Sequence, residues 1–233
     1  MIDIFLLHGI SKEVKAETYY NAFIEGIEKY LSGSQQVRWH PIDYSFLLRE
    51  KEETILSWMK ELGHPKSRKF ACDYISDILA MLHKDRPLVE GDFLYDFDKL
   101  VTTRYDTIHN FYPENRKVII GHSLGSILGY RFTWKRAFDA LIVMNSPFNY
   151  FSIGYKDFGE MNPNLPMFYN FWKKYDTVST IISKNPNFKM VKDIQVKSLN
   201  PLNWFTSKAH SACWTDKFVH KTISNILTEL EKP

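Results

Sequence analysis

The pentapeptide Gly-His-Ser-Leu-Gly at residues 121–125 constrains the fold more than any other segment of the chain. A predicted strand at 117–120 precedes it, with consecutive apolar residues at 118–120 that are typical of a strand buried on both faces, and a helical pattern at 126–137 follows it. A Gly-x-Ser-x-Gly motif between a strand and a helix forms a sharp turn that strains the backbone of Ser123 and projects its hydroxyl above the sheet. Glycines on both sides leave room for this close approach. The motif therefore predicts a nucleophilic serine at the N-terminus of a helix, where backbone N–H groups and the helix dipole favour developing negative charge.

Strand and helix patterns alternate along the rest of the chain. Further strands are expected at Ile2–Leu7, 36–42, Ala140–Met144, 165–172 and 191–199. Helices are expected at 19–31, 51–62, 70–83, Phe93–Phe111 and 216–231, and another beginning at Asp176. Alternation of this kind predicts an α/β fold, with a mostly parallel central sheet and helices on both faces. We expect a single domain over residues 1–233, with cap or lid inserts near 44–95 and 147–163.

Composition and charge exclude several classes of protein. The chain has 30 basic and 27 acidic residues, a net charge of only +3, so nothing in its charge predicts a nucleic-acid partner. Its two cysteines, Cys72 and Cys213, cannot form a disulfide framework. No run approaches the roughly 18 apolar residues that a membrane span needs, and the apolar start carries Asp3 and lacks a signal peptide's basic region. We therefore expect a cytoplasmic protein without an integral membrane segment.

Cofactor and metal motifs are missing from the sequence. Neither the phosphate-binding pattern Gly-x-x-x-x-Gly-Lys-Ser/Thr nor the dinucleotide pattern Gly-x-Gly-x-x-Gly occurs. The two cysteines lie far apart, and no pair of histidines has the spacing of zinc ligands. The expected chemistry needs neither a metal nor an organic cofactor.

Four segments together make the chain resemble the α/β-hydrolase family, in particular its small serine esterases and lipases. Residues 4–10 are similar to the family's strand ending in His-Gly, and residues 118–125 to its nucleophile strand and turn. Residues 175–179 resemble its acid loop, and residues 209–211 its histidine loop. The candidate residues follow the family's order of serine, acid and histidine.

This resemblance implies a catalytic triad of Ser123, His210 and Asp176. A serine hydroxyl needs a base to accept its proton, a histidine suits this role near neutral pH, and a carboxylate orients the imidazole. Asp176 could instead cap a helix beginning at residue 177, and Asp193 is its main rival as the acid. Asn145 occupies a position where some family members carry the acid, but an amide cannot be the anionic partner.

Further candidates surround the triad. The resemblance implies an oxyanion hole formed by the backbone N–H groups of Leu124 and Ile10, although Ser-Lys-Glu after Ile10 departs from the glycine-rich loop of many lipases. Candidate substrate-binding residues are His8, His122, Phe148 and Tyr150. His8 could instead be a histidine of the core. The aromatic stretch at 148–155 is a candidate lid or acyl-chain wall, and the alternative is a packed loop.

The expected function is hydrolysis of a small-molecule carboxylic ester through an acyl-enzyme intermediate. Acyl transfer or thioester cleavage with the same triad is an alternative, because only the acceptor or the leaving group differs. A non-catalytic binding protein that retains the fold is a second alternative, because a fold alone does not imply activity.

Overall fold

A computed structural model describes residues 1–9, 16–33, 35–47, 88–154, 158–176, 178–197 and 210–232. The chain divides into two compact units. The first combines Met1–Ile42 with Asn115–Pro233, and the second is Asp43–Glu114. The predicted cap or lid inserts near 44–95 and 147–163 stay a prediction.

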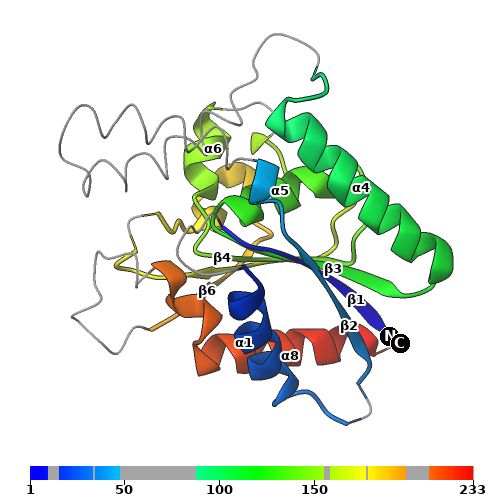
Figure 1. Cartoon of the computed structure of the whole chain (residues 1–233). Helices are drawn as coiled ribbons and strands as arrows, with labels where there is room; N and C mark the ends of the chain where they lie inside the picture. The colour runs from blue at the N-terminus through cyan, green and yellow to red at the C-terminus, as the bar shows by residue number, and fades with distance from the viewer. Residues whose placement is uncertain are drawn as a thin grey trace, which may run out of the picture. The chain divides into compact units, whose positions relative to one another are not determined.

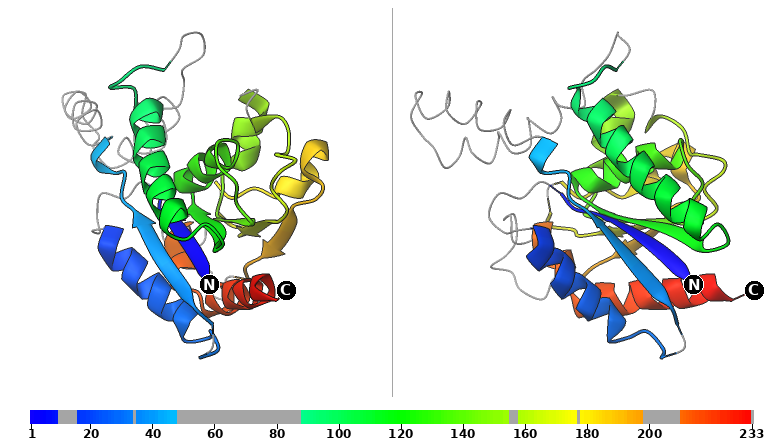
Figure 2. Two further views of the ribbon diagram at one scale, coloured as in Figure 1. Left: turned by 90° about the vertical axis from the view of Figure 1, so that its right-hand side faces the viewer. Right: turned by 45° about the vertical axis from the view of Figure 1, so that its right-hand side comes forward.

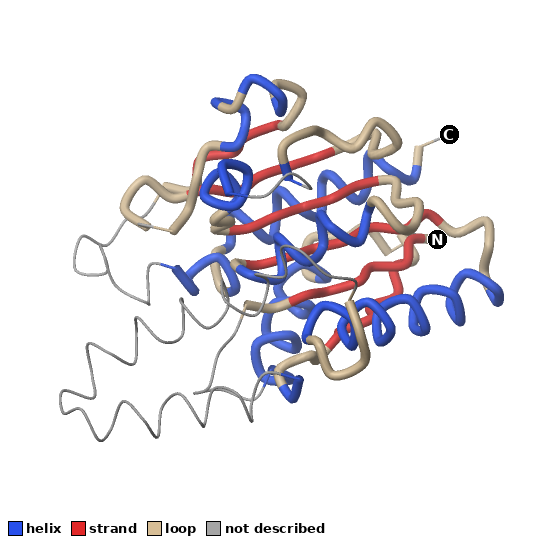
Figure 3. Tube along the Cα trace, turned by 90° about the horizontal axis from the view of Figure 1, so that it is seen from above, coloured by secondary structure: helices blue, strands red, loops and turns tan. Residues whose placement is uncertain are grey.

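The first unit contains a six-stranded sheet in the order β2-β1-β3-β4-β5-β6, and every neighbouring pair is parallel. Figures 1 and 3 show the strands side by side. The predicted α/β class with a parallel sheet is confirmed. The strands are β1 (Ile2–Leu7), β2 (Val37–Ile42), β3 (Arg116–His122), β4 (Ala140–Met144), β5 (Phe168–Trp172) and β6 (Lys192–Gln195).

Helices cover both faces of this sheet. Helices α1 (Ala16–Glu28) and α8 (Lys217–Glu231) pack together on one face, and α5 (Leu124–Thr133) lies on the other, as Figure 2 shows. The central strands β1 and β4 are buried along their whole length, which explains why β4 is a continuous apolar run and why β1 is apolar except for Asp3. Gly129 lets α5 approach the sheet closely, because a Cβ there would lie 2.9 Å from Ile119 Cγ2.

The second unit contains α4 (Phe93–Phe111), whose bounds are those expected from the sequence. Its buried Phe97 packs edge-on against Tyr44, with ring centroids 5.3 Å apart. The helices expected at 51–62 and 70–83 lie outside the described residues. Within the part of the chain that is described, no helix is long and apolar enough to cross a membrane.

Two differences from the expected elements lie near the acid candidates. The helix predicted to begin at Asp176 is wrong: residues 178–181 are not helical, and short 3-10 helices η2 (Ile182–Lys184) and η3 (Pro186–Phe188) follow. Asp176 Oδ1 accepts a hydrogen bond from Val178 N–H at 3.0 Å, so the side chain closes a local turn instead of capping a helix. Strand β5 also begins three residues later than expected, at Phe168 rather than at Leu165.

Candidate active site

The carboxyl ends of four neighbouring strands bring the predicted site residues to one edge of the sheet. Strand β1 leads into His8 and Gly9, β3 into Ser123, β4 into Asn145, and β5 is followed by Asp176. Because the strands are parallel, all four ends lie at the same edge, where ligands of open α/β sheets usually bind.

Ser123 has the strained backbone that the motif predicts, with φ 53° and ψ −124° between β3 and α5. A positive φ is uncommon for a residue with a side chain and marks a tight turn. The surrounding glycines leave no space for a side chain. A Cβ on Gly121 would lie 2.6 Å from the Gly125 carbonyl oxygen, and one on Gly125 would lie 2.4 Å from the His8 carbonyl oxygen. A Cβ on Gly9 would lie 2.7 Å from Ser123 Cβ. Gly9, which follows β1 and His8, therefore lies directly beside Ser123.

Buried hydroxyls support this turn from inside. Ser126 donates a hydrogen bond to the backbone carbonyl of Ser123, and its Oγ lies 2.6 Å from Ser146 Oγ. The N–H of Ser123 donates to the Met144 carbonyl at 3.0 Å. The backbone of Ser123 is therefore tied both to its own helix and to the end of β4.

His210 and Asp176, which are 34 residues apart in sequence, form a close pair. His210 Nδ1 lies 2.8 Å from Asp176 Oδ2, and both side chains are largely buried. The rival acid, Asp193, has other partners. Its carboxylate accepts hydrogen bonds from the backbone N–H groups of Ile182 and Ser183 at 3.0 and 2.8 Å, and it also binds the side-chain amide of Asn170.

His122 connects the nucleophile strand to His210. Its Nε2 lies 2.9 Å from the His210 carbonyl oxygen, and the two imidazole rings are 4.8 Å apart between centroids. Burial, and next the nearby His210, lower the pKa of His122 to about 3. The ring is therefore neutral, and its Nε2–H donates to the carbonyl. Ser123 follows His122 directly in the chain, so the contact of His122 with His210 links the end of the nucleophile strand to the His210–Asp176 pair within the first unit.

Asn145 is the residue of this cluster whose role the sequence did not predict. Its backbone has φ 48°, its side-chain amide donates to the His210 carbonyl, and Cys213 Sγ donates to its Oδ1 at 3.4 Å. Burial raises the pKa of Cys213 to about 12, so the thiol stays protonated. The only signal in the sequence was the place of Asn145 directly after β4, beside the nucleophile strand.

The structure describes one of the two predicted oxyanion donors, Leu124, but not the other, Ile10. Leu124 is the first residue of α5, so its N–H has no acceptor one turn earlier in the helix and lies next to Ser123. Ile10 lies outside the described residues, although Gly9 before it lies against Ser123.

The candidate substrate-binding residues have different surroundings. The His8 ring is buried and packs against Tyr20 at 5.6 Å, while the His8 N–H donates to the Tyr20 hydroxyl at 3.2 Å, which favours the core alternative. In α6 (Phe148–Gly154), Phe148 is fully buried in an aromatic cluster, which favours packing over ligand contact; its partners are Tyr130, Phe158, Phe168 and Phe188. Tyr150, in contrast, is 60% exposed.

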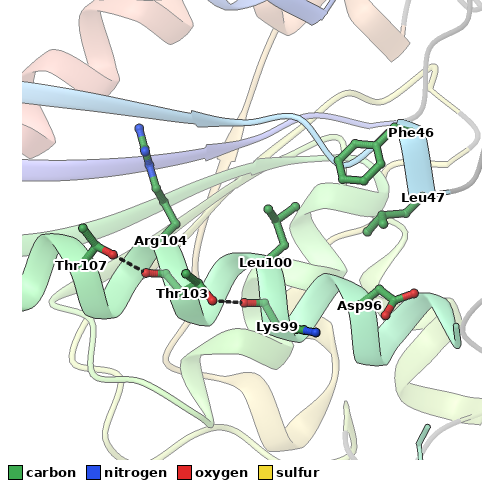
Figure 4. Close-up of a pocket in the computed structure, with 8 residues that line it drawn as sticks. All are labelled: Phe46, Leu47, Asp96, Lys99, Leu100, Thr103, Arg104 and Thr107. Carbon is green, nitrogen blue, oxygen red and sulfur yellow. Dashed lines mark hydrogen bonds between the residues drawn. The ribbon is translucent and has the colours of Figure 1, made fainter. Parts of the chain in front are cut away.

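The second unit has a pocket of its own, of about 480 Å³, shown in Figure 4. It is lined by Phe46, Leu47, Asp96, Lys99, Leu100, Thr103, Arg104 and Thr107. The hydroxyls of Thr103 and Thr107 donate to carbonyls one turn earlier in α4, each at 2.8 Å. None of the predicted site residues lines this pocket. In the part of the chain that the structure describes, no group of three or more His, Cys, Asp or Glu could hold a metal ion.

Solved structures of low sequence identity share this fold. A proposed hydrolase of the alpha/beta superfamily from Xanthomonas campestris pv. campestris is 13% identical, with a TM-score of 0.50 over 97% of this chain and 98% of that one. A proposed cell surface hydrolase from Lactobacillus plantarum WCFS1 is 14% identical, with a TM-score of 0.51 over 98% of this chain and 90% of that one. No protein-family model and no curated protein matches the sequence. The six-stranded parallel sheet and these similarities show that the chain has the α/β-hydrolase fold.

Proposed function

We propose that this chain is a serine hydrolase that cleaves a small-molecule carboxylic ester through a triad of Ser123, His210 and Asp176. The observation that carries the proposal is the strained turn at Ser123, with φ 53°, whose preceding residue His122 contacts the His210 of the His210–Asp176 pair. A strained backbone that is built tightly into its surroundings is typical of functional sites. The fold is shared by proposed hydrolases, which agrees with this activity but does not define it.

The proposed acylation begins with attack of Ser123 Oγ on the ester carbonyl carbon. His210 Nε2 accepts the hydroxyl proton, and Asp176 stabilises the imidazolium through Nδ1–H. The negative charge on the carbonyl oxygen is stabilised by the Leu124 N–H at the start of α5, and by the Ile10 N–H in the expected oxyanion hole. His210 then gives its proton to the leaving alcohol as the carbon–oxygen bond breaks, which leaves an ester between Ser123 and the acyl group.

Deacylation repeats these roles with water. His210 removes a proton from the water that attacks the acyl-enzyme, and it returns a proton to Ser123 Oγ as the acid leaves. The neutral His122 does not compete for the proton of Ser123, because its pKa is about 3 and its Nε2–H is already donated to the His210 carbonyl.

The test is mass-spectrometric mapping of the adduct with a fluorophosphonate, which captures an activated serine. We expect one label per chain, on the peptide containing Ser123, and its loss in Ser123→Ala and in His210→Ala. Ser32→Ala, at an exposed position before Gly33, is the matched control and should label fully. Absence of labelling in the folded wild-type protein would overturn the proposal and favour a binding protein.

Substrate class is tested with a matched pair of acyl donors. An oxygen ester and a thioester with the same acyl group should both acylate Ser123, and the proposal expects turnover of the oxygen ester in water. Accumulation of acyl-enzyme that turns over only when an acceptor alcohol or amine is added would instead show an acyltransferase.

A further inference from the structure

Two side chains from neighbouring strands donate to one backbone atom, the carbonyl oxygen of His210. His122, the last residue of β3, lies 2.9 Å from it through Nε2, and Asn145, directly after β4, contacts it through Nδ2. Both donors are buried, with Asn145 fully enclosed. One hydrogen bond would satisfy this carbonyl, so the second side-chain donor restrains its position further.

The chemistry of the partners fixes the direction of both hydrogen bonds. A carbonyl oxygen can only accept, so the amide nitrogen of Asn145 and a protonated imidazole nitrogen of His122 must face it. The remaining amide oxygen of Asn145 then accepts from the Cys213 thiol at 3.4 Å. Each member of the group thus has a complementary partner, and reversal of the Asn145 amide would place oxygen against oxygen.

We propose that Asn145 and His122 are positioning residues that clamp the His210 carbonyl and thereby set the imidazole relative to Ser123. This inference rests on the proposed function. Asp176 holds the far side of the ring at Nδ1, and the clamp holds the backbone from which the ring projects. Two anchors fix the location of Nε2, whereas a single hydrogen bond would leave the ring free to pivot about Nδ1.

The clamp also ties the base to the nucleophile through the sheet. His122 precedes Ser123 in the chain, and the N–H of Ser123 donates to Met144, the residue before Asn145. Both clamp donors therefore belong to the strand ends that hold Ser123. A shift of about 1 Å in a reacting group can cost on the order of 100-fold in rate. Loss of the clamp should therefore slow the reaction of Ser123 measurably.

The backbone of Asn145 explains why the tests use glycine at this position. Its φ of 48° lies in the left-handed region, where asparagine and glycine are tolerated and most other residues are strained. Asn145→Gly therefore removes the donor without adding backbone strain. Asn162 is the matched control, because it is also buried and its Nδ2 donates to a backbone carbonyl, that of Thr133, at 2.7 Å.

The first measurement is the kinetics of fluorophosphonate labelling at Ser123. For Asn145→Gly we expect the maximal labelling rate to fall by about 10- to 100-fold, with little change in the probe concentration that gives half of this rate. Asn162→Gly should lose stability but keep the labelling rate of its folded fraction. Equal labelling rates for the two variants would overturn the inference.

A second pair of variants separates the donor of His122 from its ring. His122→Phe keeps an aromatic ring and removes the donor, whereas His122→Gln keeps an N–H donor. We expect a slower maximal rate in His122→Phe and partial recovery in His122→Gln. A purely structural role for the ring predicts the reverse order.

Proton NMR makes the inference testable apart from activity. The Nδ1–H of His210, shared with Asp176, should give a downfield resonance that His210→Ala removes. Asn145→Gly should shift or broaden it, and Asn162→Gly should leave it in place. If the wild type does not label at Ser123, the proposed function fails; an unchanged resonance in Asn145→Gly would instead refute the clamp itself.

Discussion

Asp176 and Asp193 show at the scale of single residues how surroundings separate two carboxylates that the sequence leaves open. Asp193 accepts two backbone N–H groups at the start of η2, so its role is to organise that turn. Asp176 uses Oδ1 for the Val178 N–H and presents Oδ2 to His210 at 2.8 Å. The hydrogen bonds therefore favour Asp176 as the acid of the proposed triad.

The two carboxylates can be compared directly by replacing each with its amide. Asp176→Asn should lower the fluorophosphonate labelling rate at Ser123 by about 10³- to 10⁴-fold, because a neutral amide cannot stabilise the imidazolium of His210. Asp193→Asn should lower the free energy of unfolding while the folded protein still labels. Two measurements are made on each variant: the rate of labelling at Ser123, and the free energy of unfolding from a denaturation curve. A larger loss of labelling in Asp193→Asn would assign the acid to Asp193.

At the scale of elements, α8 illustrates a helix whose beginning is defined locally. Asp216 precedes its first residue and accepts hydrogen bonds from the backbone N–H groups of Phe218 and Val219 at 2.9 and 3.3 Å. The apolar residues of α8 recur at three- and four-residue spacing and pack under β1, β3 and β4. The cap and the periodicity together explain why the predicted and observed bounds of this helix agree within one residue.

The cap of α8 gives a stability prediction. Asp216→Ala should lower the free energy of unfolding by about 1 kcal/mol, because two N–H groups in the first turn lose their acceptor. Asp216→Asn keeps an acceptor oxygen and should lose much less. Urea denaturation of both variants measures the difference, and equal destabilisation would show that the side chain acts through its charge rather than as a cap.

The segment after β5 shows where local rules fail. Asp-Thr-Val-Ser at 176–179 has the pattern of a helix N-terminus, yet residues 178–181 are not helical. The Asp176 carboxylate is shared between the Val178 N–H and His210, a residue 34 positions away. A tertiary partner thus outweighs the local preference for a helix, and no pattern within the segment could have predicted it.

At the scale of the whole molecule, several buried titratable groups change stability in the same direction with pH. Burial lowers the pKa of His220, although the hydrogen bond that its Nε2–H donates to the Trp214 carbonyl opposes this shift. Burial, and next the nearby His210, lower the pKa of His122 to about 3. Burial alone would raise the pKa of Asp3, but hydrogen bonds from Arg38, His40 and Asn115 bring it below its ordinary value. The unfolded chain therefore binds more protons than the folded chain at acid pH.

We expect the free energy of unfolding to fall as the pH decreases from about 6.5 toward 4. The two histidines contribute first, because their folded-state pKa values lie below the ordinary value near 6.5, and Asp3 contributes only below about pH 4. One such histidine contributes a slope of at most about 1.4 kcal/mol per pH unit. Urea denaturation across this range measures the slope.

Substitution of the buried histidines identifies the groups responsible. His122→Gln together with His220→Gln should flatten the curve between pH 6.5 and 4, since glutamine does not titrate. His109→Gln, at an exposed position of α4, is the matched control and should retain the wild-type slope. An unchanged slope in the double variant would refute the assignment to these two residues.

The sequence by itself determined the α/β class, the strand Ala140–Met144, the helix Phe93–Phe111 and the place of Ser123 in a tight turn. These features depend on local causes: continuous apolar runs in strands buried on both faces, periodic apolar faces of helices, and glycines where a Cβ would collide with the backbone. Only the tertiary structure decided that Asp176 rather than Asp193 contacts His210, and that His122 and Asn145 meet at its carbonyl. These contacts join positions between 34 and 88 residues apart, and they exist because parallel strands bring their carboxyl ends to one edge.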